Sequence, residues 1–518
     1  MLTTSGAKEG IRPFGQADCE SEVSELKSEY SALYFDATPF NAAAINPQTY
    51  LIVGRRGSGK TALSRYFSFP GTFQNPIYID VDEPKVYHQI LLDIASHASE
   101  AREIAIPRLK RVWDYVLWNV IFEHTRYLST TIAEACEEVR PTGSASNLMN
   151  FIFDRLLAAF HESSGKEMDK HIELILNNEA LKAARLEVMK IAADRPIVIA
   201  LDTLERYDAT NSSLMNAIAA LVQCAQEFNL NFRRQGLHLK VFMSGEVFPF
   251  LVEEVLQNSL KSVKDPVYLL WRPKDLLRLI CWRFYRYLEA NDLLLEESRG
   301  VIDWTNPQEV LRRMWRPYFG KYITNARKLT EHSFSYVLRH TQMRPRQLIL
   351  LCNSIANHAI KSGRFPSFSE QDIRMGVKDV EGELASEIIN SYSSLYPEVS
   401  TIVDALMKMP MWFNGNELDE RAKQSARAWP QGTYSPLKFC RLVGELGIVG
   451  RIRKHNEEAG YIDADFEYSL RERLPLTHRD ECVIHPMFYT RLNTEFNSPL
   501  RVIPISTQTE VQDDDTFW

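Results

Sequence analysis

Cysteine is scarce in this sequence and never occurs in a paired spacing. Its 7 cysteines include no CxxC pair, and several lie in apolar periodic segments such as 277–284. This usage is typical of reduced core thiols and argues against a disulfide framework. Cys482 and His485 have a CxxH spacing that could supply half of a zinc site, but no second ligand pair lies at a suitable distance. We therefore do not expect zinc there.

Long apolar runs, a basic excess and internal repeats are also missing. Because no stretch of about 18 apolar residues and no secretion signal is found, we expect a cytoplasmic protein without a membrane span. The formal net charge is -7. A protein that depends on phosphate-backbone contacts usually carries a strong basic excess, so any nucleic-acid binding must come from a local patch. The lack of repeats argues against a solenoid.

The composition that remains is that of an ordinary soluble globular protein, with 45% hydrophobic and 25% charged residues over 518 positions. This length predicts two or three domains. The expected division is a mobile N-terminus (1–30), an α/β core (31–265, with a helical insertion at about 100–190), a helical lid (266–385), a winged-helix-like domain (386–505) and an acidic tail (506–518).

Short apolar segments alternate with helical text in the first half of the chain. Strands are expected at YLIVG from Tyr50, at 77–81, at 196–201 and at 237–243, each followed by a helical pattern. The run PIVIAL is continuously aliphatic, as in a parallel strand covered on both faces. The fold class predicted is therefore α/β, with the parallel sheet of a P-loop NTPase.

A phosphate-binding loop lies between the first strand and its helix. The segment GRRGSGKT fits the pattern GxxxxGK[ST] completely. Its glycines let successive backbone N–H groups point at phosphate oxygens, Lys60 should reach the β and γ phosphates, and Thr61 should ligate magnesium. The predicted nucleotide-binding residues are Gly54, Arg55, Arg56, Gly57, Ser58, Gly59, Lys60, Thr61 and Ala62.

A second acidic site is expected where the aliphatic strand ends. Asp202 follows PIVIAL directly, and a carboxylate at the end of a neighbouring strand can hold magnesium through water. Position 203 is Thr, so Glu205 is the nearest acidic residue that could polarise the attacking water. The alternatives are that Asp202 caps the next helix and that Glu205 is a helix-start carboxylate.

Polar residues farther along could sense the γ-phosphate. Ser244 ends the strand LHLKVFM, and it either contacts the nucleotide or caps the turn. Arg344 and Arg346 open an apolar helix, from which an arginine can reach the nucleotide only if the lid folds over it. The alternative for both arginines is a solvated helix start.

Together the segments GRRGSGKTAL, IALDTLER, KVFMSGEVFP, DLLRLICWRF and RPRQLILL resemble the AAA+ and STAND ATPases. The resemblance is strongest to the origin-recognition type and its bacterial relatives, several of which are associated with antiphage defence. It covers about residues 35–360, and HPMFYTRL is similar to the winged-helix end of such proteins.

This resemblance implies roles for individual residues. The segment FDATPF (35–40) would cup the adenine of ATP, Asp202 would bind Mg²⁺, and Ser244 and Arg346 would be the first and second sensors. Thr203 departs from the AAA+ pattern, and the Asp-x-Leu-acid order is closer to STAND proteins, which implies slow hydrolysis. The sequence does not rank three candidates for an arginine finger acting in trans: Arg272, Arg278 and Arg283.

The C-terminal domain offers a candidate DNA-reading helix at 435–450. Lys438 and Arg441 lie on it, and RIRK follows at 451–454. Between residues 391 and 505, however, 14 Lys and Arg stand against 15 Asp and Glu. Binding of double-stranded DNA and packing on the lid or on a partner protein therefore both stay open.

Three functions fit this sequence. The first is a regulatory ATPase whose nucleotide state switches assembly, or engagement of DNA or an effector protein, in a chain that could form a homo-oligomer. The second is a nucleotide-bound scaffold with little hydrolysis, suggested by Thr203. The third is a small-molecule kinase. The choice between ATP and GTP, the trigger and the partner are not decided by the sequence.

Overall fold

The computed structural model describes residues 11–81, 102–139, 178–204, 212–254, 265–325, 327–393, 395–458, 460–469 and 473–504. They form two compact units. We call residues 39–56 with 60–269 the sheet unit. We call the described residues of 1–38, 57–59 and 270–518 the helical unit. The residues expected as separate lid and winged-helix domains thus share one unit with the N-terminal segment.

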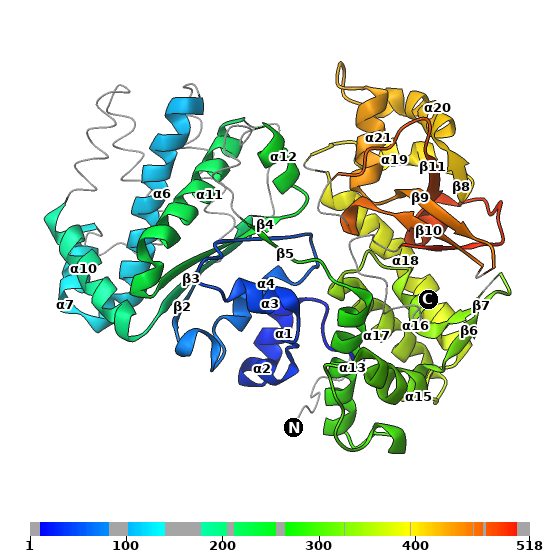
Figure 1. Ribbon diagram of the computed structural model, residues 1–518, viewed down its shortest axis with the longest axis horizontal. Helices are drawn as coiled ribbons and strands as arrows, with labels where there is room; N and C mark the ends of the chain where they lie inside the picture. The colour runs from blue at the N-terminus through cyan, green and yellow to red at the C-terminus, as the bar shows by residue number, and fades with distance from the viewer. Residues whose placement is uncertain are drawn as a thin grey trace. The chain divides into compact units, whose positions relative to one another are not determined.

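A five-stranded parallel sheet organises the sheet unit (Figure 1). Its order is β2-β3-β4-β1-β5, and every adjacent pair is parallel. The strands are β1 (Leu51–Gly54), β2 (Ile77–Val81), β3 (Ile197–Leu204), β4 (Leu237–Ser244) and β5 (Val267–Tyr268). The predicted α/β class and four predicted strands are confirmed. Strand β5 was not predicted, because two residues are too few to show a periodic pattern.

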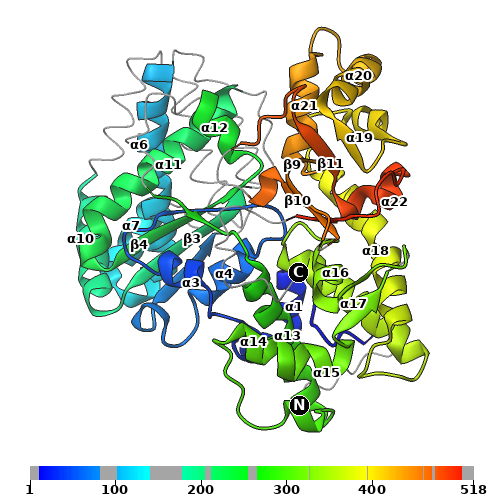
Figure 2. The same cartoon turned by 45° about the vertical axis from the view of Figure 1, so that its right-hand side comes forward.

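Helices cover both faces of this sheet, as Figures 1 and 2 show, with α6 and α11 on one face and α3 and α4 on the other. The helices are α3 (Pro39–Ala44), α4 (Lys60–Tyr66), α6 (Arg102–Thr125), α7 (Thr130–Val139), α10 (Glu179–Asp194), α11 (Ser212–Phe232) and α12 (Phe248–Glu254). The insertion between β2 and β3 is helical wherever it is described. The helical pattern VYHQILLDIASHA, expected at 86–98 after the second strand, lies outside the described residues.

Strand β3 runs farther than the sequence predicts. The pattern PIVIAL suggests an end at Asp202, whereas the strand continues to Leu204. Leu201 pairs with Val241 and Leu204 with Met243, so two residues of β3 face a single residue of β4. Such a bulge lets a strand continue past the point where its aliphatic pattern stops.

A buried lysine ties the segment before β1 to the central strand. All eight residues of β4 are buried, and Lys240 is 0% exposed. Its ammonium donates to the carbonyl oxygens of Asn46 at 2.7 Å and Thr49 at 2.6 Å. Burial lowers the pKa of Lys240 to about 7. The two carbonyls satisfy a polar group that the sheet interior otherwise disfavours.

The N-terminal segment of the helical unit is folded, which corrects the expected mobile terminus for residues 11–30. It contains α1 (Cys19–Leu26) and the start of α2 (Tyr30–Leu33). The ring of Phe14 is 1% exposed and stacks on Phe284 at 4.6 Å. Glu22 forms a buried ion pair with Arg283. The polar composition of this segment hid the few residues that anchor it.

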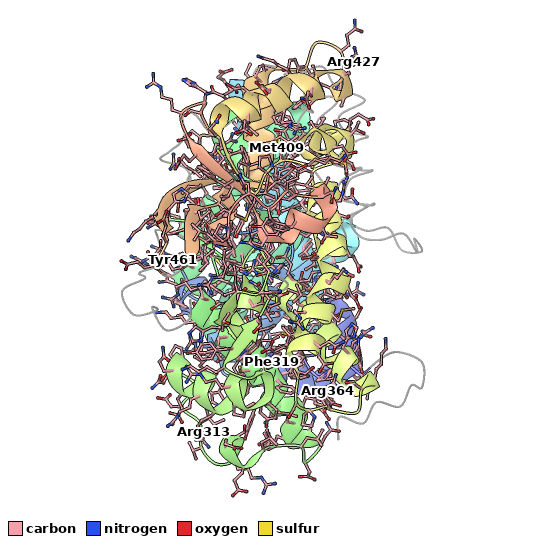
Figure 3. All side chains as sticks on the ribbon, turned by 90° about the vertical axis from the view of Figure 1, so that its right-hand side faces the viewer. Arg313, Phe319, Arg364, Met409, Arg427 and Tyr461 are labelled. Atoms are coloured by element: carbon pink, nitrogen blue, oxygen red, sulfur yellow. The ribbon has the colours of Figure 1, made fainter. Side chains whose placement is uncertain are left out.

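Helices dominate the next part of the helical unit. They are α13 (Pro273–Ala290), α14 (Pro307–Val310), the π-helical turn η6 (Leu311–Trp315), α15 (Arg316–Phe319), α16 (Ser333–Leu338), α17 (Pro345–Lys361) and α18 (Glu370–Ser391). A short antiparallel hairpin of β6 (Tyr322–Thr324) and β7 (Thr330–His332) interrupts them. Trp315 stacks on Phe319 at 3.8 Å inside one large core. Phe319 and Met409, both in this core, are labelled in Figure 3.

A mixed five-stranded sheet with winged-helix-like element order completes the helical unit. Its strand order is β12-β10-β9-β11-β8, and only β10 and β12 are parallel. The elements are α19 (Val399–Val403), β8 (Trp412–Asn414), α20 (Gly415–Ser425), α21 (Pro436–Glu445), β9 (Val449–Asn456), β10 (Tyr461–Asp465), β11 (Glu481–Ile484), α22 (Tyr489–Leu492) and β12 (Arg501–Ile503).

The hairpin of this domain lies earlier than the sequence predicts. Strand-like text was expected at 465–470 and 482–489, but the adjacent antiparallel strands are β9 and β10. Residues 467–469 form a 3-10 turn, and of the second segment only residues 482–484 belong to a strand, β11. The charged segment RIRK at 451–454, expected as a basic patch after the helix, is part of β9.

Candidate functional site: the phosphate loop

The loop between β1 and α4 has the backbone that a phosphate cradle requires. Gly57 has φ +76° and Gly59 has φ +98°, which is the left-handed region that glycine occupies without strain. Apart from Gly59 and its two chain neighbours, no heavy atom of the described residues lies within 4 Å of the position that a Cβ of Gly59 would take. Helix α4 starts at Lys60, so its unpaired N–H groups lie directly after this open space.

Two side chains of the loop fit an oxyanion. Lys60 is 5% exposed, and its ammonium donates to the carbonyl oxygens of Gly54 at 3.0 Å and Arg55 at 3.4 Å. The hydroxyl of Ser58 is buried and makes no hydrogen bond within the described part of the chain. Since buried hydroxyls are normally paired, this unpaired group and the inward lysine fit a nucleotide phosphate between them.

A glutamate that the sequence reading missed anchors the loop inside the sheet unit. Glu246 accepts the backbone N–H of Arg56 at 3.0 Å on one carboxylate oxygen and the hydroxyl of Ser244 at 2.6 Å on the other. The N–H of Gly245 also donates to the carbonyl of Gly54 at 3.0 Å. The only sequence signal for this role is a carboxylate two residues after a strand end.

The hydroxyl of Ser244 is therefore directed at Glu246. The resemblance to AAA+ ATPases implies that Ser244 is a sensor that contacts the γ-phosphate. In the structure its strand β4 pairs directly with β1. Ser244 is the register partner of Gly54, so it lies beside the start of the phosphate loop, as expected for a sensor. Its proton, however, is donated to a carboxylate that also fixes the loop. The sensor role of Ser244 stays a prediction.

The magnesium ligands are only partly described. Thr61 is the second residue of α4. Asp202 lies on β3, and its side chain is outside the described part of the structure. Strand β4 separates β3 from β1, so Asp202 is not on a strand adjacent to the loop as expected. Two strand spacings are roughly 10 Å, a distance that suits a contact to magnesium through water. Glu205 lies outside the described residues.

The tip of the loop, Gly57–Gly59, belongs to the helical unit, where two donors hold it. The backbone N–H of Arg346, at the start of α17, donates to the carbonyl oxygen of Gly57 at 3.4 Å. The indole N–H of Trp271 donates to the carbonyl oxygen of Ser58 at 2.8 Å. A Cβ on Gly57 would lie 3.1 Å from the Cβ of Arg346. Arg346 and the loop tip are thus in contact.

The two arginines of the RPRQL segment differ in setting. The guanidinium of Arg346 lies 3.5 Å from Glu387 and is about one-third exposed. Arg344 is the buried N-cap of α17 and donates to the side-chain oxygen of Gln342 at 2.8 Å. Of the two arginines, Arg346 has the more accessible side chain, and its backbone N–H and Cβ lie against the loop tip.

The other candidate residues make contacts inside the helical unit. The candidate arginines Arg278 and Arg283 are buried: Arg278 lies over the ring of Phe35 at 5.4 Å, and Arg283 pairs with Glu22. Arg272 forms an ion pair with Asp275 at 2.7 Å and is about one-third exposed. Of the three, Arg272 therefore has the most accessible guanidinium. Phe35 itself is buried, so its expected role beside adenine stays a prediction.

Comparisons with known proteins give two family matches. The Zeta toxin family matches residues 31–125, and the FunZ-associated C-terminal helical domain matches residues 306–385. The first range includes the whole phosphate loop. The loop, the parallel sheet and this match together indicate a P-loop NTPase. They support nucleotide hydrolysis or phosphoryl transfer as the class of chemistry.

A curated relative matches a larger share of the chain. It is the putative transposon gamma-delta 80.3 kDa protein of Escherichia coli (strain K12), 22% identical over 408 residues. The match covers 76% of this chain but 53% of the relative, so this chain spans about half the length of that protein. The activity of the whole relative is therefore not transferred to this chain.

The solved structure of the Aeropyrum pernix ORC2 protein, in ADPNP-ADP complexes, is also similar. The match covers 85% of this chain and 91% of that chain, with 13% sequence identity and a TM-score of 0.34. At this level the likeness carries no argument about function.

The candidate DNA-reading surface of α21 is only partly free. Arg441 forms an ion pair with Glu445 at 2.8 Å, and Arg453 lies 3.5 Å from Asp463. Lys438 and Lys454 are exposed. Two arginines of the predicted basic patch are thus paired with acidic residues.

The CxxH pair is part of the core. Cys482 and His485 are both buried, and the two ring nitrogens of His485 lie 2.9 Å from the hydroxyl of Tyr468 and 3.1 Å from the backbone N–H of Met487. Among the described residues no group of three His, Cys, Asp or Glu side chains could hold a metal ion. All seven cysteines are free thiols. In the same described ranges no helix is long and apolar enough to cross a membrane.

Proposed function

We propose that this chain is a regulatory ATPase that binds ATP with Mg²⁺ and converts ATP and water to ADP and phosphate. Its nucleotide state would control engagement of double-stranded DNA or an effector protein, in a single chain or a homo-oligomer. The observation that carries the proposal is that the carbonyls of Gly57 and Ser58 accept hydrogen bonds from Arg346 and Trp271. The loop that would bind phosphate is therefore bonded within the helical unit.

The coupling follows from the peptide groups of the loop. Their N–H sides would face phosphate oxygens, while two of their carbonyl sides are held by the helical unit. Because a peptide group is planar, a rotation that improves the hydrogen bond of its N–H to phosphate also changes the hydrogen bond that its carbonyl accepts. Loss of the terminal phosphate would thus alter the bonds to Arg346 and Trp271, and the helical unit would respond.

The residues have separate proposed roles. Lys60 would bind the β and γ phosphates, Thr61 and Asp202 would hold Mg²⁺, which neutralises phosphate charge when bound, and Glu205 would orient water. Arg346 would be the arginine sensor of the terminal phosphate. Glu246, which contacts both Arg56 and Ser244, would position the loop. A role in defence rests on the resemblance to AAA+ and STAND ATPases alone.

Phosphoryl transfer to a small molecule is the second candidate, because the Zeta toxin match extends across the loop. The two functions differ in their need for an acceptor. Phosphate release from ATP without any acceptor supports the ATPase, whereas turnover that requires an added acceptor supports the kinase.

The test is phosphate release from ATP by the wild type, by Lys60→Ala and by Lys182→Ala, a control at an exposed lysine of α10. Each protein is measured with and without double-stranded DNA, at low and at physiological salt, because phosphate contacts weaken as salt rises. We expect release by the wild type and the control only. Stimulation by DNA supports DNA as the partner, and its absence favours a protein effector. Equal release by Lys60→Ala would show that the site assignment is wrong.

A further inference from the structure

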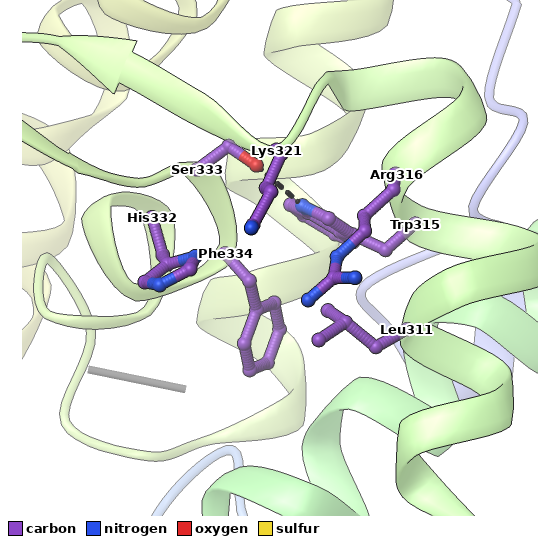
Figure 4. A pocket seen from close by; sticks show the side chains of 7 residues that line it. All are labelled: Leu311, Trp315, Arg316, Lys321, His332, Ser333 and Phe334. Atoms are coloured by element: carbon purple, nitrogen blue, oxygen red, sulfur yellow. Dashed lines mark hydrogen bonds between the residues drawn. The ribbon is translucent and has the colours of Figure 1, made fainter. Parts of the chain in front are cut away.

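A second cluster of cations lies in the helical unit, outside the phosphate loop. A pocket of about 210 Å³, including space open to solvent, is lined by Leu311, Trp315, Arg316, Lys321, His332, Ser333 and Phe334. Figure 4 shows the guanidinium of Arg316 and the ammonium of Lys321 directed at the space in front of Phe334, with His332 at its side. All seven residues lie within the 306–385 match to the FunZ-associated helical domain.

The cluster has no acidic counter-ion in the part of the chain that the structure describes. No acidic side chain is among the lining residues, and within the described ranges neither Arg316 nor Lys321 has an ion-pair partner. Burial first, and then Lys321 and Arg316, lower the pKa of His332, and a third cation, Arg501, acts in the same direction. The charged side chains of Arg316 and Lys321 face one space with no acid among the lining residues, and they create a positive potential there, while His332 stays neutral near pH 7. An anion would relieve their mutual repulsion.

The backbone around the pocket is specialised. The turn Leu311–Trp315 is π-helical, a geometry that is rare and frequent at functional sites. It carries Trp315, whose indole N–H donates to the hydroxyl of Ser333 at 2.9 Å, and it leads directly into Arg316. The hydroxyl of Ser333 in turn donates to the carbonyl of Gly320 at 2.6 Å. The wall of the pocket is thus fixed by hydrogen bonds.

We propose that Arg316, Lys321 and His332 form a binding site for a single phosphate group, separate from the phosphate loop. The basic side chains that line the pocket decide the kind of ligand. They would hold one phosphate group by charge-assisted hydrogen bonds and leave the rest of a larger ligand outside. Inorganic phosphate, a small phosphorylated molecule and the backbone of a nucleic-acid strand all carry this group.

The experiment measures the accessibility of Lys321 itself. Lysines are acetylated with a mild reagent, and the rate at Lys321 is compared by mass spectrometry with that at Lys328, which is exposed in the loop between β6 and β7. The protein carries Lys60→Ala, so that the phosphate loop does not capture the probes. The probes are inorganic phosphate and a single-stranded DNA of about 12 nucleotides, with sodium chloride at matched ionic strength as the control.

We expect phosphate to slow acetylation of Lys321 several-fold while Lys328 reacts as before. Arg316→Gln should remove this protection, whereas Arg312→Gln, at an exposed arginine that does not line the pocket, should keep it. If DNA protects Lys321 at a far lower concentration of phosphate groups than inorganic phosphate does, the natural ligand is a nucleic-acid strand. Protection by inorganic phosphate alone identifies a small ligand.

Two results would overturn the proposal: equal effects on Lys321 and Lys328 with both probes, or full protection in Arg316→Gln. Thermal unfolding of both arginine variants checks that the fold is kept. Because the assay does not measure ATP turnover, its failure leaves the proposed ATPase untouched, and failure of the ATPase leaves this site untouched.

Discussion

The indole N–H of Trp271 donates a hydrogen bond of 2.8 Å to the carbonyl oxygen of Ser58, whose own buried hydroxyl has no hydrogen-bond partner among the described residues. This bond fixes the peptide group at the centre of the phosphate loop from its carbonyl side. The side that would face phosphate is thereby oriented before any ligand binds, which lowers the ordering cost of binding.

Trp271→Phe removes this donor and keeps an aromatic ring. We expect nucleotide affinity to fall by about fivefold, as loss of one hydrogen bond of about 1 kcal/mol implies. Titration with a fluorescent ATP analogue measures it. Trp282→Phe is the matched control, because Trp282 packs against Trp304 elsewhere in the helical unit. Unchanged affinity in Trp271→Phe would show that the bond does not orient the loop.

Gly57→Ala tests the loop tip. Gly57 has a φ of +76°, and a Cβ added there would lie 3.1 Å from the Cβ of Arg346. We expect a stability loss of about 1–2 kcal/mol from the left-handed backbone and a loss of nucleotide binding. Gly432→Ala, with φ +78° and no atom within 4 Å of the new Cβ, should show the stability loss alone. Chemical denaturation and nucleotide titration of both variants separate the two effects.

The pair of Ser244 and Glu246 can be tested by a double-mutant cycle. Glu246→Gln replaces one carboxylate oxygen by an amide NH₂, so that a donor faces either the N–H of Arg56 or the hydroxyl of Ser244. This change should destabilise the protein by about 1–3 kcal/mol and slow phosphate release. If Ser244 acts only through Glu246, adding Ser244→Ala to that variant should change phosphate release little. A further large decrease would instead support direct contact between Ser244 and the nucleotide.

Asp372 supplies a pH-dependent contribution to stability. Burial raises its pKa, but hydrogen bonds from Arg364 and Ser369 outweigh that effect and bring the pKa from 3.8 down to about 2. A lowered pKa stabilises the fold above the unfolded value and ceases to do so as pH falls through the folded value. Asp372 also completes the capping box of α18 with Ser369.

Asp372→Asn should therefore lower the free energy of unfolding by about 1–2 kcal/mol at pH 7. The difference from the wild type should shrink below about pH 4 and vanish near pH 2. Urea unfolding over this range measures it. Asp379→Asn, at an exposed residue of the same helix, is the control. A difference that does not depend on pH would assign the effect to lost packing.

Parts of the candidate site could be predicted because they are encoded locally. GRRGSGKT must follow a strand and precede a helix, and the structure has β1 before it and α4 after it. The anchoring role of Glu246 could not be predicted, because its partner Arg56 is 190 residues away in the chain. The same holds for Trp271, which is 213 residues from Ser58.

In the winged-helix-like domain, a different feature limited what the sequence could predict. Its helix 436–445 has a clear amphipathic pattern and was predicted, but its hairpin strands were placed too late. The strand Val449–Asn456 is half exposed and highly charged, so its composition does not distinguish it from a loop. Pairing with Tyr461–Asp465 and Glu481–Ile484 decides its structure.

The sequence by itself determined the phosphate loop, the α/β class and most strands of the parallel sheet, because glycine spacing and aliphatic runs act within a few residues. Only the tertiary structure decided the strand order that separates Asp202 from the loop by β4, and the burial of Phe14 in a polar segment. It also decided the convergence of Arg316, Lys321 and His332 on one pocket. These features depend on which distant residues meet, and a contact across hundreds of residues leaves no periodic pattern in either partner.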